Sequence, residues 1–226
     1  MPAKKSVSDL AVSGKKVLLR CDFNVPLTAE RTISDDKRIR EALPTIRTLQ
    51  GGGAAVILCS HLGRPKGERN LKYSLAPVAA RLTELLGRPV ALADDVVGES
   101  ARAMAAALQP GEAMLLENVR FEAGEEKNDR TLSQAFAALA DLYVNDAFGT
   151  AHRAHASTAG VAEFLPSACG LLMQREIDVM GKALEAPERP FVAILGGAKI
   201  GDKIALIGNL LERCDAILVG GGMAFT

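Results

Sequence analysis

Short apolar runs alternate with longer segments of helical periodicity along the whole chain, and this alternation limits the fold more than any other feature. The runs carry no polar alternation, which is typical of parallel strands that are covered on both faces. Their alternation with helical segments predicts an α/β fold, a doubly wound, mainly parallel three-layer α/β/α sheet. The expected strands are 17–23, 54–60, 89–92, 113–117, 141–145, 191–195 and 216–219.

Helix-terminating residues support the segments between these runs. Ser74 precedes the helical pattern of 75–86, and Gly87 follows it, as expected for a helix with a capped start and a glycine after its end. Pro44 lies inside the helical pattern of 35–50. Because proline has no backbone N–H, we expect this helix to kink or split near Leu43.

A long amphipathic segment at 167–186 is followed by prolines and then by one strand-helix-strand pattern. We interpret it as a helix that joins two α/β lobes, although an ordinary surface helix would show the same periodicity. The expected division is 1–166 for the first lobe, 167–186 for the connecting helix and 187–226 for the start of a second lobe. Since a crossover strand needs a covering helix, we expect the second α/β lobe to be incomplete.

The charge balance argues against nucleic acid and membrane partners and leaves a small anionic ligand open. The chain has 27 Lys and Arg against 27 Asp and Glu, which argues against a general nucleic-acid binder and against a polybasic membrane surface. Residues 1–66 nevertheless hold twelve basic and six acidic side chains, a net charge of +6. The four cysteines lack metal-site or disulfide spacing and are expected to be reduced thiols, and no long apolar run suits a membrane helix. A cytoplasmic protein with an anion site near its N-terminus is therefore expected.

Polar side chains follow four of the expected strands. In open parallel sheets, ligands bind outside the carboxyl ends of the strands, so these positions should share one edge. Guanidinium groups there would favour a small phosphorylated or carboxylated metabolite. Taken singly, each residue has a plainer reading as a solvated charge, a turn former or a structural histidine. The residues are Asp22, Asn24, His61, Arg64, Asn118, Arg120, Asn145, Asp146, His152 and Arg153.

A glycine-rich segment follows the expected strand 191–195. Glycines at a helix start let phosphate approach backbone N–H groups, and Lys199 and Lys203 are four residues apart, so they would share a helix face. The segment is not an ordinary P-loop, because Asp202 stands where the motif needs lysine. The dinucleotide-binding glycine fingerprint is also not matched.

Taken together, the motifs resemble those of the phosphoglycerate kinase family from near residue 14 onward. The resemblance implies that the first lobe holds 3-phosphoglycerate or 1,3-bisphosphoglycerate and that the second binds ATP or ADP with Mg²⁺. The motifs that carry it are RCDFNVP (20–26), RI…LPTI (38–46), SHLGRP (60–65), LLENVRF (115–121), VNDAFGTAHRAHAS (144–157), LGGAKIGDKI (195–204) and VGGGMAFT (219–226).

Roles follow from the resemblance position by position. The phosphoglycerate ligands would be Asp22, Asn24, Arg38, His61, Arg64, Arg120 and Arg153. Lys199 and Lys203 would contact the transferred phosphates, Arg38 would act with them in catalysis, and Gly197 and Gly221 would line the nucleotide side. The Mg²⁺ contact is expected in a part of the second lobe that this sequence does not contain, so no metal ligand is assigned.

The resemblance implies reversible phosphoryl transfer between 1,3-bisphosphoglycerate and ADP, and two other functions stay open. The chain could bind 3-phosphoglycerate without catalysing transfer, or it could be a dinucleotide-dependent oxidoreductase, which shares the strand-helix pattern. A full-length form is expected to be a monomer, whereas the exposed edge of an unfinished second lobe predicts self-association.

Overall fold

The computed structural model describes residues 4–197, 201 and 204–225. The chain divides into two compact units, Met1–Arg175 and Glu176–Thr226. The boundary between them lies inside one helix, α5 (Leu171–Glu185).

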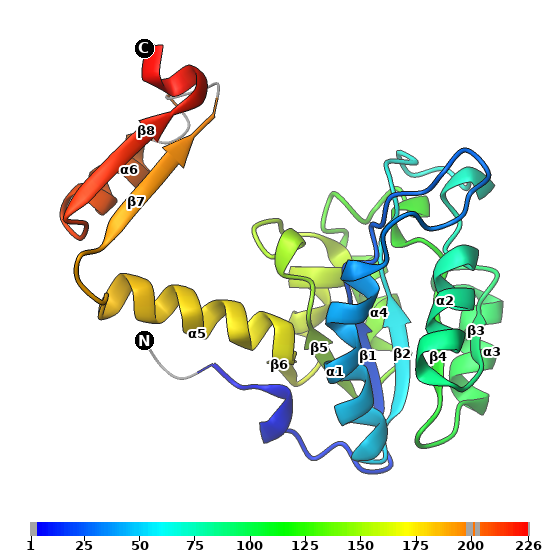
Figure 1. Ribbon diagram of the computed structural model, residues 1–226. Coiled ribbons are helices and arrows are strands. Elements are labelled where there is room, and N and C mark those ends of the chain that lie inside the picture. Colours follow the sequence, from blue (N-terminus) through cyan, green and yellow to red (C-terminus); the bar gives the residue numbers. More distant parts are fainter. Residues whose placement is uncertain (1–3, 198–200, 202–203, 226) are drawn as a thin grey trace. The chain divides into compact units, whose positions relative to one another are not determined.

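The first unit is built on a six-stranded, entirely parallel sheet with the order β3-β4-β2-β1-β5-β6 (Figure 1). The central strand β1 pairs with β2 on one side and with β5 on the other, so that Arg20 lies opposite both Cys59 and Asn145. The strands are β1 (Lys16–Arg20), β2 (Ala55–Cys59), β3 (Val90–Leu92), β4 (Ala113–Leu115), β5 (Leu142–Asn145) and β6 (Ser167–Cys169).

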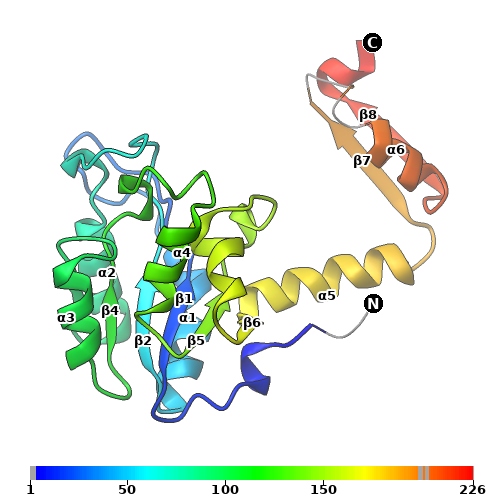
Figure 2. The same ribbon diagram turned by 180° about the vertical axis from the view of Figure 1, so that it is seen from behind.

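Helices cover both faces of this sheet (Figures 1 and 2). On one face lie α1 (Lys37–Gly51) and α2 (Ala76–Leu86), and on the other lie α3 (Glu99–Ala107) and α4 (Arg130–Ala137). Gly87 ends α2 in the left-handed conformation with φ 66°, as its position in the sequence predicts. The prediction of a doubly wound three-layer α/β/α fold is therefore confirmed.

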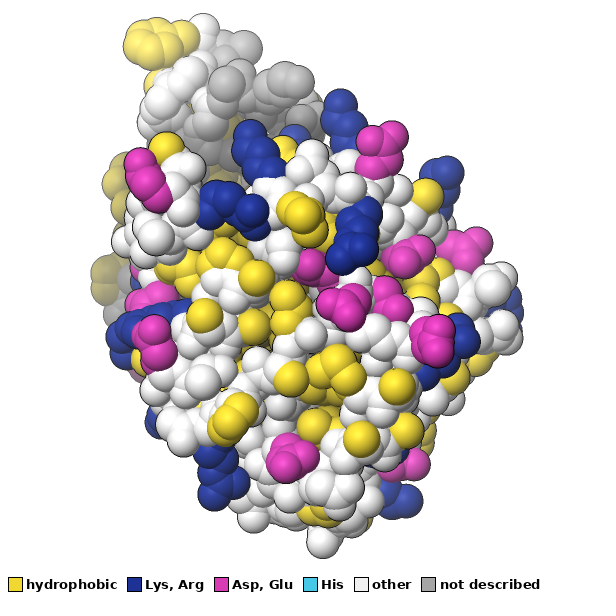
Figure 3. All heavy atoms as spheres, turned by 90° about the vertical axis from the view of Figure 1, so that its right-hand side faces the viewer, with side chains coloured by type: hydrophobic (Ala, Val, Ile, Leu, Met, Phe, Trp, Pro, Cys, Tyr) yellow, Lys and Arg dark blue, Asp and Glu magenta, His cyan; other side chains and the backbone are white. Residues whose placement is uncertain are grey.

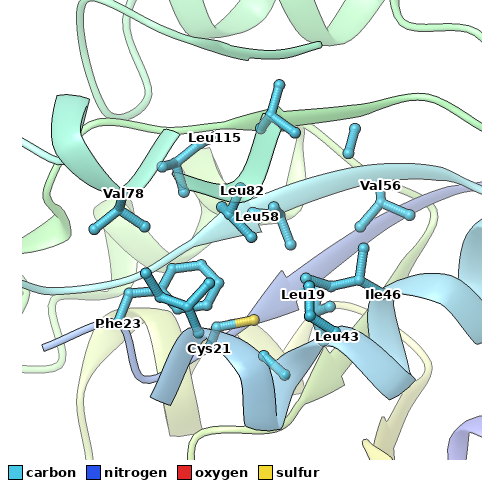
Figure 4. Close-up of a cluster of buried hydrophobic side chains, with 14 of the residues drawn as sticks. Leu19, Cys21, Phe23, Leu43, Ile46, Val56, Leu58, Val78, Leu82 and Leu115 are labelled. Carbon is cyan, nitrogen blue, oxygen red and sulfur yellow. The ribbon is translucent and has the colours of Figure 1, made fainter. Parts of the chain in front are cut away.

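Two hydrophobic cores result, because successive strand residues point to opposite faces. Leu19 and Leu58 pack against α1 and α2, whereas Leu18 and Ile57 pack against α3 and α4. Figure 4 shows the first core, where Leu43 of α1 and Leu82 of α2 meet the strand side chains. Burying each such leucine or isoleucine stabilises the fold by about 1.5–3 kcal/mol.

Two local expectations are wrong in part. The helix with Pro44 does not split, because α1 continues from Lys37 to Gly51 with this proline inside it. The buried face of α1, which includes Ile39 and Ile46, packs against the sheet and outweighs the cost of about 3 kcal/mol for an interior proline. The amphipathic segment at 167–186 is not all helix, since its first residues form β6.

The second unit contains a parallel strand pair, β7 (Val192–Gly196) and β8 (Ala216–Gly220), with α6 (Ile204–Leu211) between them in sequence. A 3-10 turn, Gly221–Phe225, follows β8. Among the described residues this unit has only these two strands, and apolar side chains on them are exposed, such as Ile194 at 78% and Leu218 at 55%.

The charged side chains on one face and the state of the cysteines bear on the predictions made from composition. On the side of the first unit that carries α2, β3 and α3, basic and acidic side chains are interspersed (Figure 3). Cys21, Cys59, Cys169 and Cys214 are thiols and not disulfides, and burial raises the pKa of Cys59 to about 12. No helix in the described ranges is both long and apolar enough to cross a membrane.

Candidate anion-binding site

One pocket at the carboxyl edge of the first sheet gathers all the side chains that the resemblance assigns to phosphoglycerate. It has a volume of about 240 Å³, and four arginines contribute to it. The loops that contribute follow β1, β2, β4 and β5, with the start of α1 beside them (Figure 1). The lining residues are Asp22, Asn24, Arg38, His61, Gly63, Arg64, Arg120, Gly149, Thr150 and Arg153.

The strand order explains why these loops meet. After β1 the chain moves through α1 to β2, on the side of the sheet that leads to β3, whereas β5 lies on the opposite side of β1. The loops after β1 and β5 therefore leave in opposite directions, and a crevice opens between them. Ligands of doubly wound proteins bind at such topological switch points.

Two nitrogen-bearing side chains of the pocket are buried: His61 is 4% exposed and Arg120 is 7% exposed. Arg120 donates from Nη1 to the Gly63 carbonyl oxygen at 2.9 Å, and its Nε lies 3.3 Å from Glu126 Oε1. That Nε has no hydrogen-bond partner among the described residues. Because a buried guanidinium loses hydration, the pKa of Arg120 is lowered from its ordinary value. An anionic ligand would restore the lost interactions.

Asp22 and Arg38 form an ion pair at the pocket wall, with Asp22 at 12% and Arg38 at 50% side-chain exposure. Asp22 also accepts from the Asn24 backbone N–H at 3.2 Å. Asn24 in turn accepts from the Gly63 N–H at 2.8 Å through its Oδ1, which ties the loop after β1 to the loop after β2. Because its oxygen accepts this bond, the side-chain NH₂ group of Asn24 remains as a donor in the pocket lining.

Arg64 and Arg153 are exposed and complete the lining. Arg153 donates from Nε to His152 Nε2 at 3.1 Å, which fixes the direction of its planar head. His152 itself does not line the pocket. These two arginines supply charge at an accessible position, where guanidinium groups can grip an incoming anion in bidentate fashion.

A second hollow lined by arginines shows why the first suits an anion. It is larger, about 720 Å³, and holds Arg31, Arg40 and Arg81. Three carboxylates, from Asp35, Asp36 and Glu84, line it as well. Arg81 pairs with Asp36 at 2.8 Å, and Arg40 pairs with Asp36 at 2.9 Å. Its charges are therefore internally balanced, whereas the first pocket has four guanidinium groups and one carboxylate.

Three polar residues that follow strands serve the fold and not the pocket. Asp146 is buried and accepts from the Met173 N–H at 3.1 Å, near the start of α5. Asn118 donates to the carbonyl oxygens of Leu62 and Tyr73 at 2.7 and 2.9 Å. Asn145 accepts from the Ala147 N–H at 3.0 Å. For these side chains the plainer reading as turn and loop formers is correct.

Reasoning from the sequence missed the small residues of the pocket, Gly63, Gly149 and Thr150. A Cβ at Gly149 would lie 2.7 Å from Asp22 Oδ2, so only glycine leaves the Asp22–Arg38 pair undisturbed. Gly63 has φ 62° and would bring a Cβ within 2.5 Å of the Tyr73 ring. Their place inside the SHLGRP and NDAFGTAHR motifs was the available signal.

In the second unit, Gly197 and Gly221 lie together after β7 and β8. Their φ angles are 148° and 66°, and a Cβ on Gly221 would lie 3.5 Å from the Gly197 nitrogen. The Met223 N–H donates to the Gly197 carbonyl oxygen at 2.9 Å. Lys199 and Lys203 lie outside the described residues.

Within 4–197, 201 and 204–225, no three His, Cys, Asp or Glu side chains converge in a way that would hold a metal ion. These residues therefore offer no cluster of this kind for Mg²⁺.

The sheet and its pocket define a doubly wound α/β protein with a cationic site at the topological switch point. The family model for phosphoglycerate kinase matches residues 7–226, and the chain belongs to that family. Phosphoglycerate kinase from Coxiella burnetii is 44% identical to it, with a TM-score of 0.88 over 99% of this chain. That from Pyrococcus horikoshii OT3 is 35% identical, with a TM-score of 0.86 over 98% of this chain.

Both solved structures are longer proteins. The match covers 56% of each of them, so the chain spans little more than half of their length. The family membership excludes a dinucleotide-dependent oxidoreductase as the class of this protein.

Proposed function

We propose that the first unit binds 3-phosphoglycerate or 1,3-bisphosphoglycerate and that the chain acts in reversible phosphoryl transfer to ADP, a step of glycolysis in the cytoplasm. The observation that carries the proposal is the convergence of four arginines, His61 and Asn24 around one pocket with a single carboxylate. Membership of the phosphoglycerate kinase family supports the same substrate.

The pocket offers partners for each group of the ligand. Phosphoglycerate carries a phosphate, a carboxylate and a hydroxyl group. The exposed guanidinium groups of Arg64 and Arg153 suit the phosphate, because planar N–H donors match its oxygens. The buried donors of His61 and Arg120 suit an anionic group that has lost its water. Asp22, an acceptor, suits the hydroxyl.

The transfer step itself does not require the protein to add or remove a proton. A carboxylate nucleophile is ionised at neutral pH, so no general base is required. What remains is to align the reactants and to place cations around the transferred oxygens. We assign these cations to Arg38 and Lys199, with Lys203 on the same phosphate chain and Gly197 and Gly221 beside the nucleotide. Mg²⁺ would arrive with ATP or ADP and neutralise phosphate charge.

The proposal includes a division of the chain. Residues 1–166 form the phosphoglycerate lobe, 167–186 the connection and 187–226 the start of the nucleotide lobe. Transfer requires both substrates in one water-poor site, since water would hydrolyse the acyl phosphate. We therefore propose that closure about α5 brings the lobes together during the reaction.

Calorimetric titration of 3-phosphoglycerate into the chain tests the binding half of the proposal. We expect saturable binding that Arg38→Ala weakens by about ten- to a hundredfold, because one guanidinium contact to an anion is lost. Arg40→Ala is the matched control, since Arg40 lies two residues further along α1 and faces the other hollow. No binding by the parent chain, or equal losses in both variants, would refute it.

An assay of transfer tests the other half separately. ATP formation from 1,3-bisphosphoglycerate and ADP by the chain is expected if its second unit binds nucleotide, and titration with Mg-ADP measures that binding directly. Binding of 3-phosphoglycerate without ATP formation would identify the chain as a binding module.

A further inference from the structure

A buried arginine lies behind the pocket and contacts one of its side chains. Arg20, the last residue of β1, is 1% exposed and does not line the pocket. A guanidinium group in the protein interior must be paired and hydrogen-bonded, because its loss of hydration is costly. The hydrogen-bond partners of the Arg20 guanidinium therefore indicate its role.

All three nitrogens of Arg20 have partners. Nε donates to Ser157 Oγ at 2.8 Å, Nη1 donates to the Cys21 carbonyl oxygen, and Nη2 lies 3.3 Å from His61 Nδ1. Ser157 is held in turn by buried Glu125: its Oγ donates to Oε1 at 2.5 Å and its N–H donates to Oε2 at 2.9 Å. The result is a continuous buried chain from Glu125 through Ser157 and Arg20 to His61.

The hydrogen bonds that Arg20 makes in this chain have a fixed direction. The Ser157 hydroxyl has one proton, which it gives to Glu125, so its oxygen accepts from Arg20. A guanidinium group has no acceptor and can only donate to His61 Nδ1. The imidazole must therefore carry its proton on Nε2. This holds whatever the protonation of Glu125, because Arg20 donates in either case.

The surroundings of His61 also disfavour a second proton. Burial comes first, followed by the positive charges of Arg20 on β1, Arg120 after β4 and Arg38 on α1, with a smaller effect of His155. Together they lower the pKa of His61 to about 2. Asp22 lines the same pocket but is paired with Arg38.

We propose that Arg20, oriented by Glu125 through Ser157, is a positioning residue that holds His61 as the neutral Nε2–H tautomer. His61 then offers the pocket one directed N–H donor whose state does not change between pH 5 and pH 8. The proposal rests on the proposed function only for the identity of the ligand, 3-phosphoglycerate.

Nitrogen NMR of the ¹⁵N-labelled chain reads the tautomer directly, without ligand. The chain has three histidines, so a His61→Gln spectrum assigns the His61 signals. We expect Nδ1 to have the shift of an unprotonated ring nitrogen and Nε2 that of a protonated one, unchanged from pH 8 to pH 5. A protonated Nδ1, a mixture of tautomers or titration near pH 6.5 would overturn the proposal.

Two variants separate positioning from a structural role. Ser157→Ala removes the hydroxyl between Glu125 and Arg20, and Tyr143→Phe removes a hydroxyl that donates to the Ser157 carbonyl oxygen at 2.9 Å. Both lose a buried hydrogen bond, but only Ser157→Ala is expected to mix the His61 tautomers. If Tyr143→Phe mixes them equally, or if Ser157→Ala leaves them unmixed, the relay is refuted.

Substitution of His61 itself tests what the tautomer is for. Gln places an amide donor near the position of Nε2, whereas Asn reaches only as far as Nδ1. We expect His61→Gln to retain affinity for 3-phosphoglycerate at least fivefold better than His61→Asn. Equal affinities would contradict a donor role for Nε2. A parent chain that binds no 3-phosphoglycerate would refute the proposed function and leave the NMR result to decide the tautomer.

Discussion

A methyl group at position 149 would collide with the carboxylate of Asp22. The distance from an added Cβ to Asp22 Oδ2 would be 2.7 Å, shorter than side chains tolerate, so the Asp22–Arg38 pair would have to move. We expect Gly149→Ala to weaken 3-phosphoglycerate binding about tenfold, equivalent to about 1.4 kcal/mol, while the fold is retained. Titration calorimetry measures the change.

Gly51→Ala is the matched control for this substitution, because nothing lies within 4 Å of a Cβ added there and the residue is in a helix. Its affinity should equal that of the parent chain. If Gly149→Ala also binds normally, the position of the Asp22–Arg38 pair does not matter for the ligand.

Protonation of His61 gives the free energy of unfolding a defined pH dependence. Its pKa is about 2 in the folded chain and near 6.5 when unfolded, so the unfolded state alone takes up this proton between those values. The stabilising contribution is present above pH 6.5 and is lost as the pH falls below it, by up to about 1.4 kcal/mol per pH unit. His61→Gln removes this term.

Urea unfolding followed by circular dichroism at pH 7, 6 and 5 measures the effect. As the pH falls, the free energy of unfolding of the parent chain should decrease faster than that of His61→Gln. The contributions of all other titrating groups cancel when the two proteins are compared. Parallel curves for the two proteins would show that His61 has an ordinary pKa.

The residues of the site were predictable to different degrees. Charged and amide side chains after strand ends were predictable because a parallel sheet places all its carboxyl ends at one edge. Gly149 was not, since its role depends on close approach to Asp22, which spacing does not encode. Arg20 was also missed as a site residue, because a position inside a strand does not reveal which buried groups meet it across the sheet.

At the scale of elements, the expected strands of the first unit are all present, and β6 was missed. Ser167–Cys169 is only three residues long and follows a proline, so it lacks the apolar run that marked the others. It pairs with β5 through tertiary contact alone, for example Val144 with Ala168. Short edge strands of this kind are set by the sheet and not by local sequence.

Helix α1 tolerates Pro44 because the proline lies on its exposed side, between the buried Leu43 and Thr45. The missing N–H still costs a hydrogen bond. We expect Pro44→Ala to raise the free energy of unfolding by about 1–2 kcal/mol, after allowance for the greater freedom of the unfolded chain. Thr48→Ala, an exposed position on the same helix, should gain only a few tenths. An unchanged or lowered stability for Pro44→Ala would contradict this explanation.

At the scale of the whole molecule, the net charge of zero conceals a positively charged site. The N-terminal 66 residues hold the excess of basic side chains that includes Arg38 and Arg64, while Arg120 and Arg153 come from the more acidic remainder. Composition thus indicated that an anion site could exist, and only the topology of the sheet specified where it lies.

The second unit exposes apolar side chains on β7, α6 and β8, including Ile194 at 78% and Leu211 at 67%. Exposed large apolar side chains of this kind favour association. We expect the 226-residue chain to form oligomers in sedimentation velocity at high concentration, and Ile194→Asp to reduce them. Leu71→Asp, at a similarly exposed position of the first unit (60%), should not. A clean monomer throughout the concentration range would contradict this expectation.

A crystal structure of the chain with 3-phosphoglycerate tests the central claim most directly. We predict that the ligand lies between the loops after β1, β2, β4 and β5, with its phosphate on Arg64 and Arg153 and its carboxylate on Arg38, His61 and Arg120. Ligand bound instead in the charge-balanced hollow lined by Arg40 and Arg81, or absent from the pocket at saturating concentration, would contradict it.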